Sequence, residues 1–258
     1  MYQRIKPTWK ERLYSSYISS GQVNSSQKGP GAVFLLRKAY IQKIIREHFP
    51  SDKNIQILDL GCGEGAFIYY LSQAGYNNVY GVDASAEQVA LAHACGISQV
   101  EQLDINDYLS TAGDESADVV LLMDVLEHFQ RQELFDILDE VLRILRPGGE
   151  IIAHVPNASG IFGMQVLYGD LTHELAFTPK SAQQLLTTTG FQRVKCCEDK
   201  PVVHGIASAL RRLIWDCGTI PARILLAAET GGFSAILSRT MLIRAMKPVA
   251  IPDRKLNP

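Results

Sequence analysis

The chain has 258 residues, of which 47% are hydrophobic and 20% charged, and its formal net charge is −2. This composition excludes a largely disordered chain, and the charge argues against a wholly basic nucleic-acid-binding protein. The length suits one large α/β domain. We expect no transmembrane helix, because no run of about 18 uncharged apolar residues is present. The first residues lack the apolar core of a signal peptide, so we expect a cytoplasmic protein.

The polar N-terminal stretch 1–30 contains Ser and Gly clusters and predicts a loop or a loosely docked lid. In the next stretch, 32–49, apolar residues recur along one helical face, which predicts an amphipathic helix that ends at Pro50. We therefore treat 1–50 as an N-terminal lid and helix.

Short apolar runs then alternate with helical patterns. We expect strands at 55–60, 78–83, just before Asp104, at 117–124 and at 150–156, with helices at 66–73, 86–94 and 132–145 between them. This alternation predicts right-handed βαβ units on a parallel sheet. A helix at 180–189 and strands at 191–199 and 240–248 follow. We place a Rossmann-like core at 51–200 and a distinct segment at 201–258.

Three glycines, Gly61, Gly63 and Gly65, follow the first strand and free the backbone there to approach a ligand closely. Gly61, Gly63 and Ala66 also satisfy the G-x-G-x-x-[G/A] pattern of a dinucleotide site. In either case Asp83, which ends the second strand, would accept hydrogen bonds from ribose hydroxyls.

Asp59 helps to separate the two ligands. Its carboxylate lies just before the glycines, where it would repel a pyrophosphate but attract a ligand that carries an ammonium and a sulfonium. S-adenosylmethionine is such a ligand.

The ordered set Asp59-x-Gly61-x-Gly63-x-Gly65, Asp83, Asp104 and LLMDVLEH, together with the run RILRPGGEIIAHVPN, resembles the class I S-adenosylmethionine-dependent methyltransferases. The resemblance covers about 55–198. It implies a doubly wound, mostly parallel seven-stranded sheet with an antiparallel last strand. It also implies cofactor contacts from Asp59, Gly61, Cys62, Gly63, Gly65, Asp83, Ala84, Asp104, Ile105, Asp124 and Val125. Two of these have a purely structural alternative: Asp104 and Asp124 would each suit the cap of a following helical turn.

Methyl transfer to a hydroxyl requires the removal of a proton, so one of the six histidines could act as the base. His173 lies in the long connection after strand five, where family members usually shape the acceptor pocket, and is our first candidate, with Asp170 or Glu174 to orient it. His128 is the second candidate, with a structural bond to a neighbouring loop as its alternative role. We expect His154, inside strand five, to be a core histidine. No clear metal-ligand set of the catechol-methyltransferase type is present, so we expect a metal-free mechanism.

The stretch 156–191 and the tail after it look like methyltransferases associated with glycan and polysaccharide biosynthesis. We therefore expect an S-adenosylmethionine-dependent transfer to an oxygen or nitrogen of a small molecule, with a sugar or glycan precursor as the acceptor and no nucleic acid as partner. Two other readings stay open: a NAD-dependent oxidoreductase that uses the same turn, and a non-catalytic protein that binds the cofactor.

The stretch 202–232 carries apolar residues at helical spacing, interrupted near Gly218–Pro221. It predicts two short helices inserted between strands six and seven. Lys and Arg outnumber Asp and Glu by 8 to 3 after Lys200, whereas they are outnumbered 17 to 24 in residues 1–200. We expect the two helices either to cover the sheet edge or join two copies in a homodimer, or to lie on a membrane surface with their arginines at lipid phosphates.

Overall fold

The computed structural model describes residues 8–16, 32–232 and 234–249. Most of the predicted lid, 1–7 and 17–31, lies outside the described residues. In the described part of the lid, 8–16, α1 (Trp9–Tyr14) is a short helix. Among the described residues, no helix combines the length and the apolar composition needed to cross a bilayer.

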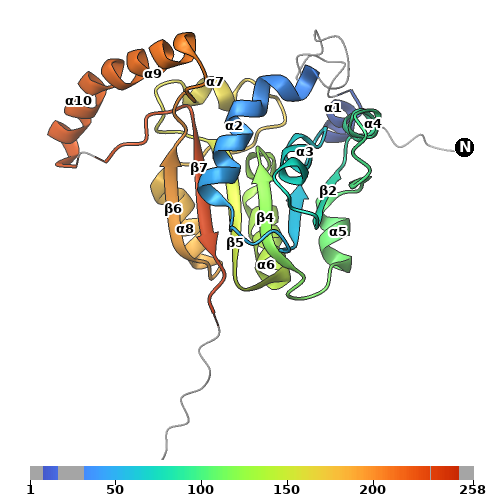
Figure 1. The fold of residues 1–258 in the computed structure, drawn as a ribbon. Helices are drawn as coiled ribbons and strands as arrows, with labels where there is room; N and C mark the ends of the chain where they lie inside the picture. Colours follow the sequence, from blue (N-terminus) through green and yellow to red (C-terminus); the bar gives the residue numbers. More distant parts are fainter. Residues whose placement is uncertain (1–7, 17–31, 233, 250–258) are drawn as a thin grey trace, which may run out of the picture.

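A seven-stranded sheet forms the centre of the molecule, in the order β3-β2-β1-β4-β5-β7-β6 (Figure 1). All neighbouring strands are parallel except that β7 runs antiparallel to both β5 and β6. The predicted fold class is therefore confirmed. The strands are β1 (Ile57–Leu60), β2 (Val79–Asp83), β3 (Val100–Gln102), β4 (Ala117–Met123), β5 (Leu145–Pro156), β6 (Gln192–Glu198) and β7 (Thr240–Met246).

Helices cover both faces of the sheet, and each face has its own apolar cluster. One cluster contains α2 (Ala32–His48), α3 (Ala66–Gln73) and α4 (Ala86–Ala94). The other contains α5 (Ile105–Thr111), α6 (Arg131–Ile144) and α8 (Pro179–Thr188). The central strands are buried on both faces, as expected of parallel strands between two helical layers, which explains their continuous apolar runs.

Strand β5 begins at Leu145, five residues before the predicted start at 150. Leu145 pairs with Ala117 of β4, and the β4–β5 register then shifts before it resumes at Val119 and Glu150. The Pro-Gly-Gly run lies between these two pairs. It therefore interrupts the pairing of β5 with β4 and does not precede it.

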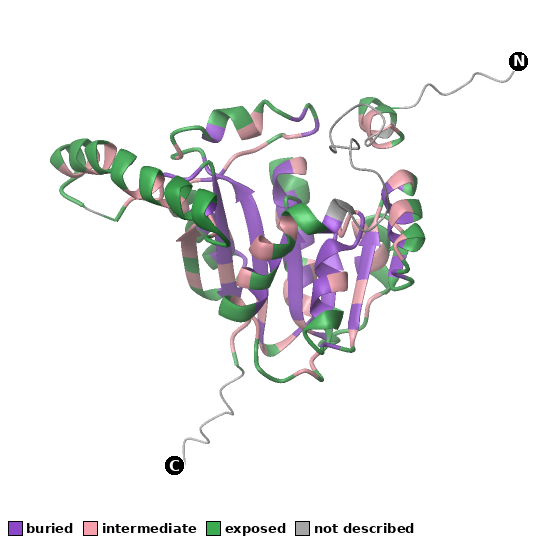
Figure 2. Ribbon diagram, turned by 45° about the horizontal axis from the view of Figure 1, so that its top comes forward, coloured by how far each residue is buried: buried purple, intermediate pink, exposed green. Residues whose placement is uncertain are grey.

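The predicted pair of inserted helices is present between β6 and β7, as α9 (Ile206–Gly218) and α10 (Ile220–Thr230). They extend from one side of the sheet as an arm (Figure 1), and most of their surface is exposed (Figure 2). After α10 the chain continues into β7, which lies between β5 and β6 and pairs with both.

Candidate functional site: two adjoining cavities

The chain turns sharply where β1 leads into α3, and the backbone there needs glycine. Gly61 has φ +71°, and a Cβ on it would lie 2.6 Å from Val125 Cγ2. Gly63 has φ +56°, and its N–H donates to Asp83 Oδ2 at 2.8 Å. Asp83 Oδ1 accepts from the N–H of Ser85 at 2.8 Å. One carboxylate at the end of β2 therefore holds the turns that follow two neighbouring strands.

These turns border a cavity of about 680 Å³, which we call the turn cavity. Ten of the eleven predicted cofactor contacts line it, and they come from the carboxyl ends of β1, β2 and β4 and from the start of α5. They are Asp59, Gly61, Cys62, Gly63, Asp83, Ala84, Asp104, Ile105, Asp124 and Val125. Ligands of open α/β sheets bind at this edge, outside the carboxyl ends of the strands.

Gly65, the eleventh predicted contact, is not among the residues that line this cavity. It precedes the first residue of α3 with φ +77°, and a Cβ there would lie 3.1 Å from Ile97 and 3.2 Å from Val100. Close packing and a left-handed backbone therefore account for this glycine.

Asp59 is 1% exposed, and its Oδ1 atom has no hydrogen-bond partner among the described residues. Burial raises the pKa of this carboxyl to about 7, although Arg37 acts in the opposite direction. A buried carboxylate without a partner favours a cationic ligand group, because the cation would compensate the cost of desolvation. This agrees with the preference for an ammonium-bearing ligand inferred from the sequence.

Asp104 is the N-cap of α5, since its Oδ1 accepts from the N–H of Asn106 at 2.8 Å. The capping role and a place on the cavity wall are therefore combined in one residue.

Asp124 does not cap the helical turn that follows it, which was the alternative role that the sequence offered. Its backbone is left-handed (φ +58°), and its Oδ1 pairs with His154 Nδ1 at 2.6 Å. A left-handed conformation is uncommon for a residue other than glycine and tends to occur at functional sites.

Two helices contribute residues to the turn cavity that the sequence did not single out. Lys10 and Tyr14 of α1 line it, and Lys10 Nζ donates to the carbonyl of His128 at 3.1 Å. Arg37 of α2 lines it as well and lies 3.3 Å from Glu64 Oε1. The described part of the predicted lid is thus in contact with the site. The amphipathic pattern of α2 placed Arg37 on the polar face but could not show what that face borders.

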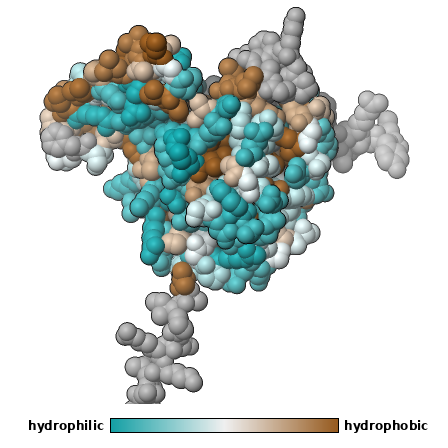
Figure 3. All heavy atoms as spheres, viewed as in Figure 1, coloured by the Kyte–Doolittle hydropathy of each residue, from teal (hydrophilic) through white to brown (hydrophobic). Residues whose placement is uncertain are grey.

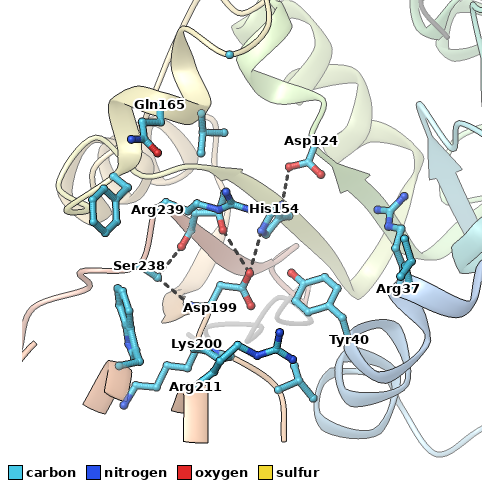
Figure 4. Close-up of a pocket in the computed structure, with 18 of the residues that line it drawn as sticks. Arg37, Tyr40, Asp124, His154, Gln165, Asp199, Lys200, Arg211, Ser238 and Arg239 are labelled. Carbon is cyan, nitrogen blue, oxygen red and sulfur yellow. Dashed lines mark hydrogen bonds and ion pairs between the residues drawn. The ribbon is translucent and has the colours of Figure 1, made fainter. Parts of the chain in front are cut away.

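A second, larger cavity of about 1040 Å³ adjoins the first, and we call it the outer cavity (Figure 4). Leu36, Arg37 and Asp124 line both cavities. Residues of α2, β5, α7 (Gly163–Leu167), α9 and the segments next to β6 and β7 surround it. Together, the two cavities give room for a cofactor and for a second molecule on opposite sides of Asp124.

His154 is buried, as predicted for a core histidine, and it also lines the outer cavity. Its Nδ1 donates to Asp124, and its Nε2 lies 3.3 Å from Asp199 Oδ2 (Figure 4). Burial lowers its pKa, but the two carboxylates outweigh this effect and raise it to about 10. In turn, although burial raises the pKa of Asp124, His154 lowers it below its usual value. His154 is therefore a cation at neutral pH and cannot act as a base.

His173 lines the outer cavity and His128 the turn cavity, and their ring centroids are 4.7 Å apart. His173 Nδ1 lies 3.0 Å from the carbonyl of Val166 and must donate to it, which leaves the lone pair on Nε2. That atom lies 4.0 Å from Glu127 Oε1.

His128 makes the loop contact that the sequence offered as its structural role. Thr172 Oγ1 donates to Asp170, so it accepts from His128 Nδ1 at 2.8 Å. Burial lowers the pKa of His128 to about 4, so this imidazole is neutral at pH 7.

Glu127, His128 and His173 form a group whose candidate ligand atoms lie within 4.8 Å of one another and which could hold a metal ion. Glu127 is fully buried, and within the described part of the chain neither of its carboxylate oxygens has a hydrogen-bond partner. Burial raises the pKa of Glu127 well above its usual value, and Asp124 adds to the shift. The sequence did not reveal this cluster, because His173 lies 45 residues after His128. The expectation of a metal-free mechanism stays a prediction.

Comparison with known proteins identifies the family of this chain. A model described as "Methyltransferase domain" matches residues 58–153. A ubiquinone biosynthesis O-methyltransferase of Rickettsia typhi is 30% identical over 172 residues, which are 61% of this chain and 68% of that protein. The chain belongs to the class I S-adenosylmethionine-dependent methyltransferases. This membership favours S-adenosylmethionine over a nicotinamide dinucleotide as the ligand of the glycine turn.

Other class I methyltransferases match over different lengths. A relative of the same name from Sinorhizobium medicae is 32% identical over 132 residues, so the match spans 47% of this chain and about half, 52%, of that relative. A crystal structure of an S-adenosylmethionine-dependent methyltransferase from Archaeoglobus fulgidus has a TM-score of 0.62 at 22% identity, over 90% of this chain and 99% of that one, and shares the fold. Both named relatives are ubiquinone biosynthesis O-methyltransferases, so they do not support the resemblance to glycan-biosynthesis enzymes.

The turn cavity fits S-adenosylmethionine by the chemistry of its donor set. The unpartnered oxygen of Asp59 suits the ammonium of the methionine part, Asp83 suits the ribose hydroxyls, and Asp104 with Ile105 suits the adenine. When bound, this cofactor supplies a methyl group on a sulfonium leaving group.

Proposed function

We propose that this protein transfers a methyl group from S-adenosylmethionine to an oxygen atom of a small molecule. The observation that carries the proposal is the junction of the two cavities at Asp124, with the cofactor-type residues on one side and a roomy second cavity on the other. The relatives named as O-methyltransferases support oxygen as the receiving atom.

Positioning of the acceptor is the main catalytic task of this chain. Methyl transfer is an in-line displacement, and a reaction between two well-oriented groups gains effective molarities of order 10⁵ M or more. The ion pair of Asp124 with His154 fixes the wall between the cavities, because Asp124 is also held by its N–H bond to the carbonyl of His154 at 3.0 Å. This rigid wall would orient an acceptor hydroxyl toward the methyl group.

The proton of that hydroxyl needs an acceptor, and we assign this role to His173. His154 is already protonated, and His128 faces the turn cavity with its Nδ1 committed to Thr172. His173 lies on the outer cavity and carries its lone pair on Nε2. Glu127, beside this nitrogen, would accept a hydrogen bond from the imidazolium once it has formed.

A sugar or glycan precursor is the acceptor class that we propose. Support comes from the resemblance of the 156–191 stretch and from polar side chains on the wall of the outer cavity, which include Gln165, Asp199, Lys200, Ser238 and Thr240. These side chains offer hydrogen-bond donors and acceptors that the hydroxyl groups of a sugar can use. The relatives are named for ubiquinone biosynthesis, so quinone precursors are the alternative acceptors to be tested.

Transfer of radiolabelled methyl groups tests the proposal and the non-catalytic alternative together. We expect S-adenosylmethionine to label a hydroxyl compound in a panel of sugar nucleotides, quinone precursors and amines. His173→Ala should lower turnover by about 10²–10⁴-fold with nearly unchanged cofactor affinity, as for the loss of a general base. His128→Ala, the comparison variant, should instead weaken cofactor binding or folding. Cofactor binding with no labelled product across the panel would favour the non-catalytic reading.

A further inference from the structure

The helical insertion between β6 and β7 forms one wall of the outer cavity. Pro201, Val202, His204, Arg211 and Trp215 all line that cavity and all come from this segment. The insertion is therefore placed to select what enters the cavity.

Two cations on this side of the cavity have no partner among the residues that the structure describes. Arg211 of α9 and Arg239, just before β7, both line the outer cavity, and their side chains make no hydrogen bond or ion pair within the described part of the chain. In Figure 4 they lie around the same space as His154 and Asp199. Both are exposed, so a dissolved ligand can reach them.

The other arginine and lysine side chains of the cavity are compensated within the protein. Arg37 lies 3.3 Å from Glu64, and Lys200 lies 3.2 Å from Asp216. The contrast matters because a guanidinium that lines a cavity and has no carboxylate beside it is available to a ligand.

The carboxylates on the same wall are already engaged. Asp199 Oδ2 accepts from Thr240 Oγ1 at 3.2 Å and lies beside the imidazolium of His154, and its N–H donates to Ser238 Oγ at 3.0 Å. Asp124 shares the same histidine. Within the described residues, neither carboxylate forms an ion pair with Arg211 or Arg239.

We infer that the acceptor carries a phosphate or diphosphate group and that Arg211 and Arg239 bind it, a substrate class that rests on the proposed function. Guanidinium groups present several N–H donors in a plane and match the oxygens of phosphate in pairs. Two guanidinia from separate segments suit a group with many oxygens, such as a diphosphate. Trp215, four residues after Arg211 on the same helix, adds a flat side chain to the wall on which a ring of the same acceptor can stack.

Binding of pyrophosphate and of uridine diphosphate to the full chain, saturated with S-adenosylhomocysteine, tests this inference by calorimetry. We expect both probes to bind the unaltered protein, and Arg211→Gln and Arg239→Gln each to weaken binding at least tenfold. Arg193→Gln is the matched control, because Arg193 is exposed near the opposite end of β6 and lines neither cavity. It should leave binding unchanged.

The phosphate could be dissolved or belong to a lipid, and vesicles with phosphatidylglycerol distinguish the two sources. Vesicle binding that depends on both arginines, without binding of the dissolved probes, would assign the site to lipid-linked phosphate. Binding of either dissolved probe that survives the double variant Arg211→Gln/Arg239→Gln would overturn the inference. If neither probe binds, vesicle binding that the double variant leaves unchanged would overturn it too, and so would the absence of vesicle binding. S-adenosylhomocysteine binding, measured in every variant, separates these outcomes from a failure of the proposed function.

Discussion

The carboxylate of Asp83 has two tasks at the end of β2. It accepts N–H bonds from Gly63 and Ser85, and it lines the turn cavity where ribose hydroxyls would bind. The bonds to the backbone were not evident from the sequence, which indicated only the ligand contact. Removal of this side chain should therefore affect both the turn and the ligand.

Asp83→Ala should abolish most of the rise in melting temperature that S-adenosylhomocysteine causes. A ligand that binds only the folded state stabilises it by mass action, and a charged acceptor for a hydroxyl contributes about 1.5–3 kcal/mol. The unliganded variant should also melt earlier, since two backbone N–H groups lose their acceptor. Thermal scans with and without the ligand measure both effects, with Asp107→Ala, an exposed residue of α5, as the control. An unchanged ligand-induced shift in Asp83→Ala would show that the ribose binds elsewhere.

His154 is held as a cation between Asp124 and Asp199, and this gives folding a pH dependence with a definite sign. Its pKa is about 10 in the folded protein, against an ordinary value of 6.5. Below pH 6.5 the histidine is protonated in both states, so its contribution to stability is fully present. As the pH rises from 6.5 to 10, only the folded state keeps the proton, and the contribution is lost.

We therefore expect His154→Gln to be destabilising at pH 6 and to lose less stability than the unaltered protein between pH 7 and 9.5. The difference in slope should approach about 1.4 kcal/mol per pH unit at most. Urea denaturation at a series of pH values measures it, with His93→Gln as the control, because His93 lies outside this network. Parallel pH profiles for His154→Gln and the unaltered protein would contradict the assigned charge.

At the scale of elements, α9 and α10 carry apolar residues that the fold leaves exposed. Ile206 is 91% exposed and Leu225 72%, and α10 has no buried residue. Figure 3 shows apolar side chains gathered on this arm. Most arginines of the arm are not free to meet a lipid: Arg212 pairs with Asp216, and Arg223 pairs with Glu198. Arg211, by contrast, is free and lies at the cavity.

The sequence offered membrane contact as one of two roles for these helices. Such contact would depend mainly on their exposed apolar residues, among them Ile206, Ile214 and Leu225, which we call the apolar stripe. We expect the protein to float with vesicles of anionic lipid at low salt, less so at higher salt, and Ile214→Glu/Leu225→Glu to abolish flotation. Gln183→Glu/Thr187→Glu adds the same charge to exposed positions of α8 and is the control. If the unaltered protein stays in the soluble fraction at low salt, the membrane reading is wrong. A dimer that dissociates in Ile214→Glu/Leu225→Glu would then assign the stripe to a second copy.

At the scale of the whole molecule, the predicted elements and the observed ones agree where apolar periodicity and glycine or proline punctuation are both strong. Helices α3 and α4 begin and end at the predicted residues, and the break between α9 and α10 lies within Gly218–Pro221. The adjacent Cys196 and Cys197 pack against opposite apolar clusters, as the alternation of a strand requires.

The sequence by itself determined the family, the order of the elements and the acidic residues at the carboxyl ends of the first strands. It could do so because strand ends and tight turns are marked by nearby residues, and because parallel strands bring their carboxyl ends to one edge. The tertiary structure decided which distant side chains meet. His154 lies next to Asp124 only because the β4–β5 register pairs Met123 with His154, and it meets Asp199 only because β7 and β6 follow β5 in the sheet. Local periodicity contains no information on register between strands, so the charge of His154, the outer cavity and the unpaired arginines at its wall emerge only from packing.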